Sequence, residues 1–190
     1  TPRVLTRKKD IEQVHICLAF PGVEQDDEDL YPISVMNNLF GGGMSSRLFQ
    51  RIREEMGAAY SVYSFPSTYT NCGTFTVYAG TSPETAQQVA DELHNQIRLL
   101  RDGGVTQEEF DMAKEQLKVS YVLGLESSSA RMSAIGRSKL LRGHAVDPQD
   151  VICKIEAVTK EDVERAAHRM FGRPFSASAV GRNIDGLKLL

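Results

Sequence analysis

The order of strand-type and helix-type patterns constrains the fold of this chain more than any other feature. In residues 14–20, apolar and other side chains alternate up to Pro21, which predicts a strand. Residues 58–65 and 74–81 are rich in Tyr, Val, Phe, Ser and Thr, which is typical of two strands of an antiparallel hairpin. A last strand is predicted over residues 175–180.

Helix signals fill the segments between these strands. Acidic residues at 26–29 precede an apolar stretch that runs to Phe40, where Gly41-Gly42-Gly43 ends the predicted helix. In residues 44–56, apolar side chains recur every four positions, so a second helix is predicted there, ended by Gly57. Further helices are predicted to begin at the capping signals of Ser82, Thr106, Ser127, Asp147 and Thr159.

Strands and helices are thus segregated rather than alternating as β-α-β units. This order predicts an α+β fold with a largely antiparallel sheet packed against several helices. The length of 190 residues suits one domain with a sizeable core. We expect the domain to cover residues 11–182, with 1–10 as a polar leader or linker and 183–190 as a loose tail. The chain does not begin with Met, so we expect a piece of a longer protein.

Composition excludes several classes of partner. A net charge of -3 without a basic cluster gives no reason to expect nucleic acid or an anionic membrane. No apolar run approaches the roughly 20 residues that span a bilayer. Cys17, Cys72 and Cys153 lie far apart and form no CxxC pair, so a disulfide framework is not expected. This usage favours a reducing compartment, and we expect a cytoplasmic protein.

Two groups of residues suggest chemistry, each with a simpler structural alternative. Gly41-Gly42-Gly43 is either a flexible turn between helices or a loop that contacts the backbone of a ligand. Arg53 and Tyr60 are either a solvated arginine and a sheet aromatic, or two hydrogen-bond donors for a carbonyl group and its oxyanion. The serines of 127–129 with Arg131 are interpreted as a helix N-cap with a solvated side chain.

A metal site is not expected within this chain. The four histidines, His15, His94, His144 and His168, form no HxxEH or HExxH motif. His168 follows Glu164 by four positions on a predicted helix, but two ligands do not complete a zinc site.

Several segments, taken in order, resemble one family. The segments are Glu12-Gln13-Val14-His15 with Phe20-Pro21-Gly22, residues 39–50 (LFGGGMSSRLFQ), Ile52-Arg53-Glu54-Glu55, residues 57–64 (GAAYSVYS), and residues 124–132 (GLESSSARM) with Gly136-Arg137. They resemble the M16 zinc metallopeptidases, the relatives of insulinase, pitrilysin and mitochondrial processing peptidase. The likeness is greatest to the carboxy-terminal domain of the short bacterial processing proteases, and it extends over residues 11–182.

The resemblance implies a clam of two similar α+β halves. The other half would hold zinc through HxxEH and a later glutamate, so zinc belongs to the full enzyme and none is bound by this chain. Tyr60 would hydrogen-bond the scissile carbonyl or its oxyanion, and Arg53 would bind a backbone carbonyl of the substrate. Gly41, Gly42 and Gly43 would belong to a loop near the cleft. The expected substrate is an extended peptide or an unstructured protein segment.

The resemblance also defines the partners and the alternatives. The partner would be the HxxEH-bearing amino-terminal half, either in the same polypeptide or in a separate subunit of a homo- or heterodimer. This chain alone is expected to be inactive, and the full protein is expected to be a zinc metalloendopeptidase. One alternative is a non-catalytic structural or assembly relative, like the core subunits of a respiratory complex. The other is a peptide-binding module without chemistry.

Overall fold

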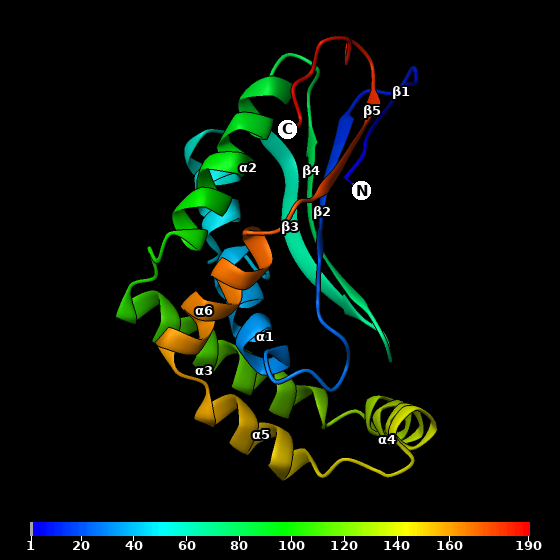
Figure 1. Ribbon diagram of the computed structural model, residues 1–190, viewed down its shortest axis with the longest axis vertical. Coiled ribbons are helices and arrows are strands. Elements are labelled where there is room, and N and C mark those ends of the chain that lie inside the picture. Colours follow the sequence, from blue (N-terminus) through cyan, green and yellow to red (C-terminus); the bar gives the residue numbers. More distant parts are fainter. Residues whose placement is uncertain (1) are drawn as a thin grey trace.

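The computed structural model describes residues 2–190 and shows a two-layer α+β arrangement (Figure 1). One layer is a five-stranded sheet with the order β1-β5-β2-β4-β3. Its strands are β1 (Val4–Lys8), β2 (Val14–Pro21), β3 (Ala59–Thr68), β4 (Gly73–Thr81) and β5 (Ser176–Gly181). The helical elements are α1 (Leu30–Phe40), a π-helical segment η1 (Phe49–Glu55), α2 (Ala86–Arg101), α3 (Gln107–Gly124), α4 (Ser128–Arg142), α5 (Pro148–Ala157) and α6 (Lys160–Phe171).

The sheet is largely antiparallel, as the sequence predicts. β2 pairs antiparallel with β4 and β5, β4 pairs antiparallel with β3, and only β1 and β5 run parallel. Along β2, the side chains that alternate in the sequence are buried on one face, and those between them are half-buried on the other. The period of two therefore identified the core face of the central strand correctly.

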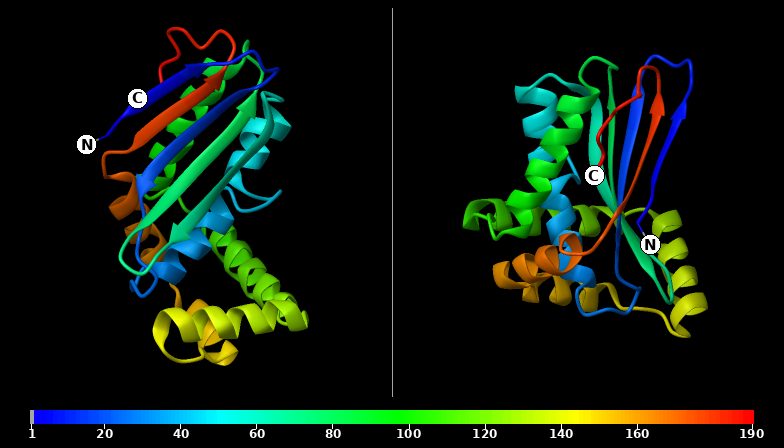
Figure 2. Two further views of the ribbon diagram at one scale, coloured as in Figure 1. Left: turned by 90° about the vertical axis from the view of Figure 1, so that its right-hand side faces the viewer. Right: turned by 45° about the horizontal axis from the view of Figure 1, so that its top comes forward.

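The helices α1, α2, α3, α5 and α6 lie on this core side of the sheet (Figure 1). Phe171 of α6 joins the two layers, since its ring lies 4.9 Å from that of Phe20, 5.6 Å from that of Phe40 and 5.7 Å from that of Phe75. In the left view of Figure 2 the opposite face of the sheet is turned toward the reader and unobstructed. We call this the outer face, and it carries His15, Tyr63 and Tyr78.

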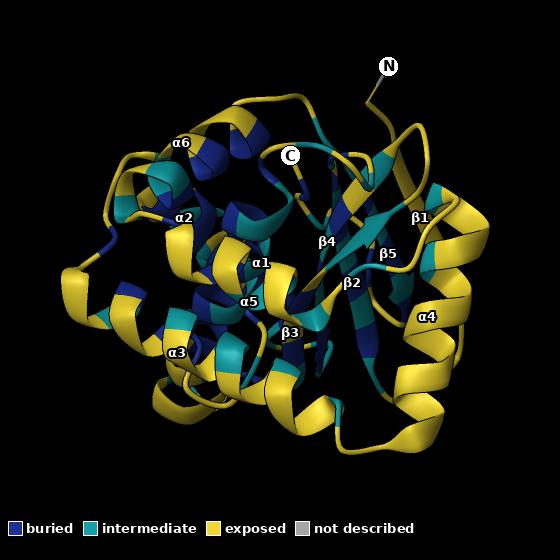
Figure 3. Cartoon of the chain, turned by 90° about the horizontal axis from the view of Figure 1, so that it is seen from below, coloured by how far each residue is buried: buried dark blue, intermediate teal, exposed yellow. Residues whose placement is uncertain are grey.

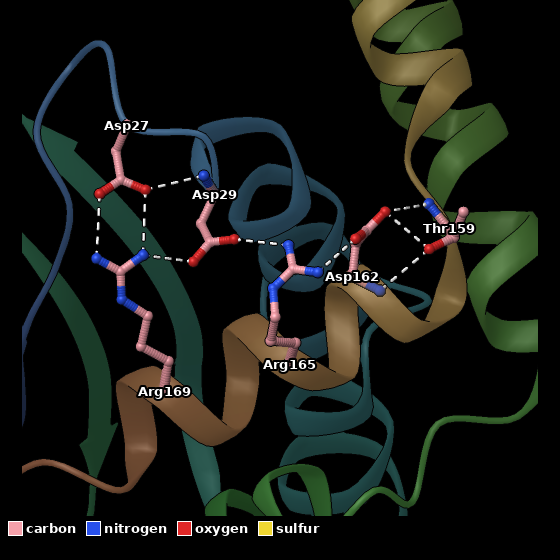
Figure 4. A network of polar contacts seen from close by, with 6 residues as sticks. All are labelled: Asp27, Asp29, Thr159, Asp162, Arg165 and Arg169. Atoms are coloured by element: carbon pink, nitrogen blue, oxygen red, sulfur yellow. Dashed lines mark hydrogen bonds and ion pairs between the residues drawn. The ribbon is translucent and has the colours of Figure 1, made fainter.

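A network of charged side chains holds the segment just before α1 against α6 (Figure 4). The carboxylate of Asp29 is 2% exposed and accepts hydrogen bonds from Arg165 at 2.9 Å and Arg169 at 2.6 Å. Arg169 also contacts Asp27. Burial raises the pKa of Asp29, but hydrogen bonds from the two arginines outweigh it, so the net pKa is lowered. The carboxylate therefore stays ionised and ties two distant segments together.

Helix α4 lies away from the other helices, beyond the end of the β3–β4 hairpin (Figures 1 and 3). Every one of its residues is exposed or half-buried. Its N-cap is as predicted, because the Ser127 hydroxyl accepts a hydrogen bond from the amide of Ala130. Arg142, at its last turn, contacts Asp26 at 2.9 Å and the backbone carbonyl of Gln25 at 3.1 Å.

The two chain ends differ from the prediction. Residues 4–8 of the expected leader form β1, which pairs with β5 in parallel register from Val4–Ala177 to Lys8–Gly181. All five residues of β1 are exposed, so backbone pairing with β5 and an ion pair of Lys8 with Asp185 hold it, and no apolar alternation marks it. The expected loose tail is packed as well, because Ile184 and Leu189 are buried in the core. Both β1 and these two residues therefore lie outside the predicted bounds of 11 and 182.

The predicted second helix, residues 44–56, is also only partly correct. Leu48 and Ile52 are buried as the spacing indicates, but Met44 is 74% exposed and lies in a turn before η1. The helix predicted from Ser82 begins at Ala86, with Thr85 as its N-cap residue.

Candidate functional site

The segment from η1 to β3 builds the candidate site by a tight reversal of the chain. The amide of Met56 donates to the carbonyl of Arg51 at 3.1 Å, a bond over five residues that is typical of a π-helix. The amide of Ala58 then donates to the carbonyl of Ile52 at 3.0 Å. Between them, Gly57 has φ +59°, the left-handed region in which glycine carries no penalty. The reversal leads the chain from η1 directly into β3.

Tyr60 is the extra residue of a β-bulge. Ala59 pairs with Thr81 and Ser61 pairs with Gly80, so the register skips Tyr60. A bulge leaves one residue without a partner and re-aims its side chain. The Tyr60 side chain is 62% exposed, so its hydroxyl is open to a ligand.

Arg53 lies on η1, the element that contacts the start of β3. Its guanidinium lies 4.9 Å from the centre of the Phe49 ring, a cation–π contact within one segment. Arg53 is exposed. Figure 2 shows η1 and the loop before it beside the β3 edge of the sheet. The structure thus places the two predicted donors on adjoining elements at one edge.

The three glycines before η1 differ in their surroundings. A Cβ added to Gly41 would lie 2.5 Å from the backbone nitrogen of Ser64. Gly41 is buried, and its carbonyl accepts a hydrogen bond from that nitrogen at 3.0 Å. A Cβ on Gly42 would lie 2.8 Å from Asn38 Cα, whereas the nearest atom to a Cβ on Gly43 would be 3.8 Å away. Gly41 thus has a packing role against β3, and Gly42 and Gly43 form the accessible part of the loop.

The loop after the glycines is held to α3 by a partly buried ion pair. Arg47 donates to both carboxylate oxygens of Glu109, each at 2.7 Å, and to the carbonyl of Gly104. Burial raises the pKa of Glu109, while hydrogen bonds from Arg47 and from the Thr106 amide lower it, for a net value of about 2. This pair lines a cavity of about 450 Å³ between the loop, η1, α2 and α3, and Arg53 and Tyr60 are not among its lining residues.

The described part of the chain offers no metal centre. Among residues 2–190, no three His, Cys, Asp or Glu side chains are grouped to hold an ion. His15 Nδ1 lies 2.6 Å from the Tyr78 hydroxyl, His94 Nε2 lies 3.2 Å from the carbonyl of Leu189, and His144 Nδ1 contacts a backbone carbonyl. The same residues include no helix that is both long and apolar enough to cross a membrane.

Sequence reasoning missed a polar cluster on the outer face beside the Tyr60 bulge. It consists of Gln13, His15, Ser61 and Tyr78, which meet around Gly80. Gln13 and His15 belong to the segment Glu12–His15 that carries part of the family resemblance, but no role was assigned to them. The signal that marks them in the sequence is their alternation with the buried Val14.

Comparison with known proteins identifies the family. The family described as "peptidase M16 inactive domain" matches residues 1–117. Zinc protease YmxG of Bacillus subtilis is 40% identical over 176 residues, which are 93% of this chain and 43% of that protein. Zinc protease SCO5738 of Streptomyces coelicolor is 41% identical over 170 residues, 90% of this chain and 37% of that protein. The chain therefore spans less than half the length of these relatives.

Solved structures show the same fold over nearly the whole chain. A peptidase M16 inactive domain from Pseudomonas fluorescens superposes with a TM-score of 0.85 at 23% identity, covering 95% of this chain and 44% of that one. A chain of complex III2 from Candida albicans superposes with a TM-score of 0.86 at 20% identity, covering 99% and 47%. The sequence match and the fold agree, and the chain belongs to the M16 metallopeptidase family as a domain of its inactive type.

Proposed function

We propose that this chain is the substrate-gripping half of a zinc-dependent endopeptidase that cleaves peptides or unstructured protein segments. In this proposal, Tyr60 donates a hydrogen bond to the scissile carbonyl oxygen, and Arg53 binds a neighbouring backbone carbonyl. Residues 2–190 contain no group of side chains that fits a zinc ion, so the HxxEH-bearing half would hold it. The Gly42-Gly43 loop would border the cleft, with Gly41 anchoring it on β3. We place the assembled enzyme in the cytoplasm, which the three unpaired cysteines suit.

The observation that carries the proposal is the bulge at Tyr60. The bulge takes Tyr60 out of the regular pairing of β3 with β4, and Tyr60 is more than half exposed, while Arg53 is exposed on the adjoining element η1. Peptide hydrolysis requires a donor where negative charge develops on the carbonyl oxygen, and a tyrosine hydroxyl is such a donor. An arginine is suited to a second carbonyl because it has five N–H donors and accepts none.

Helix α4 supports the presence of a partner half. Met132, Ile135 and Leu140 are each more than half exposed along this helix. Apolar side chains gathered on one exposed element indicate a protein contact. The chain covers only 43% of YmxG and 44% of the Pseudomonas structure, so the relatives contain a further part that such a surface would contact. We propose that this part is the zinc-bearing half, in the same polypeptide or in a second subunit.

A structural or assembly role is the second candidate. The fold similarity to a chain of complex III2 favours it, since that chain belongs to a large assembly. A purely structural copy of the fold, however, does not require an exposed tyrosine at a bulge together with an exposed arginine on the adjoining element. A stable stoichiometric complex that cleaves no peptide would support the second candidate.

The test is peptide cleavage by this chain assayed together with the HxxEH-bearing half. Tyr60→Phe, which removes only the hydroxyl, is expected to lower kcat on the order of 100-fold, as loss of an oxyanion donor does. Arg53→Ala is expected mainly to raise KM, because it removes binding common to ground and transition states. Tyr69→Phe, at an exposed turn tyrosine, is the matched control and keeps wild-type kinetics. Wild-type turnover of Tyr60→Phe would refute the role of Tyr60.

A further inference from the structure

The guanidinium of Arg53 lies over the ring of Phe49, four residues earlier on η1. Its central carbon is 4.9 Å from the centre of the ring, within the range of a cation–π contact. A side chain on a helical segment leans toward the start of that segment and reaches the residue four positions earlier. Arg53 is exposed and Phe49 is half-buried, so the ring forms a support for an exposed cation.

Packing in the hydrophobic core does not account for the Phe49 ring. Leu48 and Ile52, before and after it in the sequence, are fully buried in that core. Among residues 2–190, Phe49 belongs neither to the core nor to the half-buried apolar side chains packed against it. The contact that the structure gives this ring is the one with Arg53. Its role is therefore toward its charged neighbour.

Another arginine of η1 is held in a different way. Arg51 donates to Glu55 at 2.7 Å and to Glu92 at 3.1 Å. The Arg53 side chain forms no ion pair and no hydrogen bond with any residue between 2 and 190, and the Phe49 ring takes the place of a carboxylate. Two arginines on one short segment thus have two kinds of partner.

The kind of partner decides what each arginine can still bind. A carboxylate occupies N–H donors of a guanidinium and offsets its charge. A ring face accepts the cation without occupying any of its five N–H donors in a conventional hydrogen bond. All five therefore remain available to Arg53 for carbonyl oxygens, the acceptors that the proposed function assigns to it.

The ring also restricts the part of Arg53 that the backbone leaves free. The amide of Met56 donates to the carbonyl of Arg51, and the amide of Ala58 donates to the carbonyl of Ile52. These bonds fix the backbone on both sides of Arg53, so the remaining freedom is in its side-chain torsions. An arginine side chain loses rotamer entropy when it is held, and holding it before substrate arrives lowers that cost of binding.

We propose that Phe49 is the positioning residue for Arg53. Its ring holds the guanidinium in one place on η1 and leaves the N–H donors free for a backbone carbonyl of the substrate. The inference rests on the proposed function of Arg53, and it adds the side chain that prepares this arginine for binding.

The expected kinetic effect is weaker substrate binding with unchanged turnover. Phe49→Leu removes the ring and keeps an apolar side chain. An exposed cation–π contact corresponds to about a 2- to 5-fold change in an equilibrium constant, so we expect KM to rise by this factor. We expect kcat to stay within about 2-fold of wild type, because a carbonyl that does not react is bound equally in the ground and transition states. Phe49→Tyr, which keeps the ring face, should retain the wild-type KM.

A double-mutant cycle of Phe49→Leu and Arg53→Ala, with this chain assayed beside the HxxEH-bearing half, tests the inference. If Phe49 acts through Arg53, Phe49→Leu raises KM in the wild type and has no further effect once the guanidinium is gone. An equal rise in both backgrounds, or a wild-type KM for Phe49→Leu alone, overturns the positioning role. If Arg53→Ala itself keeps the wild-type KM, the proposed function of Arg53 fails, and the inference with it.

A spectroscopic measurement tests the contact independently of activity. In enzyme with 13C-labelled arginine, the δ-CH2 protons of Arg53 should resonate upfield, because the ring current of Phe49 shields protons above its face. Phe49→Leu should remove this shift, and Phe49→Tyr should retain it. Unchanged Arg53 signals in Phe49→Leu would contradict the inference.

Tyr31→Leu is the control for the loss of a half-buried ring that faces a cation. The Tyr31 ring lies 5.8 Å from Lys154 Nζ and packs against the core, so its removal disturbs the structure without touching Arg53. This variant should keep the wild-type KM. A rise in KM equal to that of Phe49→Leu would assign the effect to a general loss of structure and overturn the positioning role.

Discussion

Arg47 and Glu109 form a bidentate ion pair across 62 positions of the sequence, with both N–O distances at 2.7 Å. The pair joins the loop after the three glycines to the first turn of α3. Glu109 is also the fourth member of the capping box that begins with Thr106. One carboxylate thus closes the start of a helix and holds the loop that leads into η1, so its contacts affect both.

Arg47→Ala is expected to lower the free energy of unfolding by about 2 kcal/mol, because it leaves Glu109 and the Gly104 carbonyl without their charged donor. Denaturant unfolding of the purified chain measures this. Arg101→Ala is the control, since Arg101 pairs with Asp102 where both side chains are more than one-third exposed, and such surface pairs contribute little to stability. Equal losses in both variants would contradict the importance assigned to the Arg47 pair.

The same pair predicts how stability depends on pH. The pKa of Glu109 falls from 4.5 to about 2 on folding, so between these values the unfolded chain binds more protons than the folded chain. The stabilisation is therefore complete above about pH 4.5 and is lost as pH falls toward 2. Glu109→Gln should be less stable than wild type at neutral pH, and the two should converge near pH 2. Unfolding midpoints measured from pH 7 to 2 test this, and a pH-independent difference would refute it.

Gly41→Ala is expected to lower the free energy of unfolding by about 1–3 kcal/mol, as overpacking does. The added methyl group would lie 2.5 Å from the backbone nitrogen of Ser64, and backbone cannot move aside as a side-chain end can. Ser64→Ala should therefore not restore stability in the double variant. Gly43→Ala is the control within the same loop, because the nearest atom to its Cβ is 3.8 Å away. Thermal unfolding of the four proteins compares them.

Much of the fold could be predicted from local signals in the sequence. The capping boxes at Thr106 and Thr159 mark helix starts correctly, because both partners of each box lie within four residues. The alternation in β2 is equally local. β1 was missed because its five residues are all exposed and its partner strand lies more than 160 positions away. Backbone pairing between exposed, distant segments produces no periodicity.

The candidate site, like the fold, could be predicted from the sequence only where local signals mark it. Arg53 and Tyr60 could be selected because they fall in segments that resemble a known family. Their presentation could not be predicted, since the bulge at Tyr60 is a property of the register between β3 and β4. The contact of His15 with Tyr78 joins positions 63 apart, on the neighbouring strands β2 and β4. Sequence identifies such groups singly, and the sheet brings them together.

The reversal at Gly57 provides the last prediction, which separates backbone strain from steric packing. Gly57 has φ +59°, and a Cβ there would meet nothing within 4 Å. Gly57→Ala should therefore lower the free energy of unfolding by about 1 kcal/mol through the left-handed backbone alone. Gly57→Asn should lose less, since asparagine adopts this conformation more readily than other residues with a side chain. Denaturant unfolding measures both; an alanine variant as stable as the wild type would show that the left-handed reversal between η1 and β3 does not require glycine.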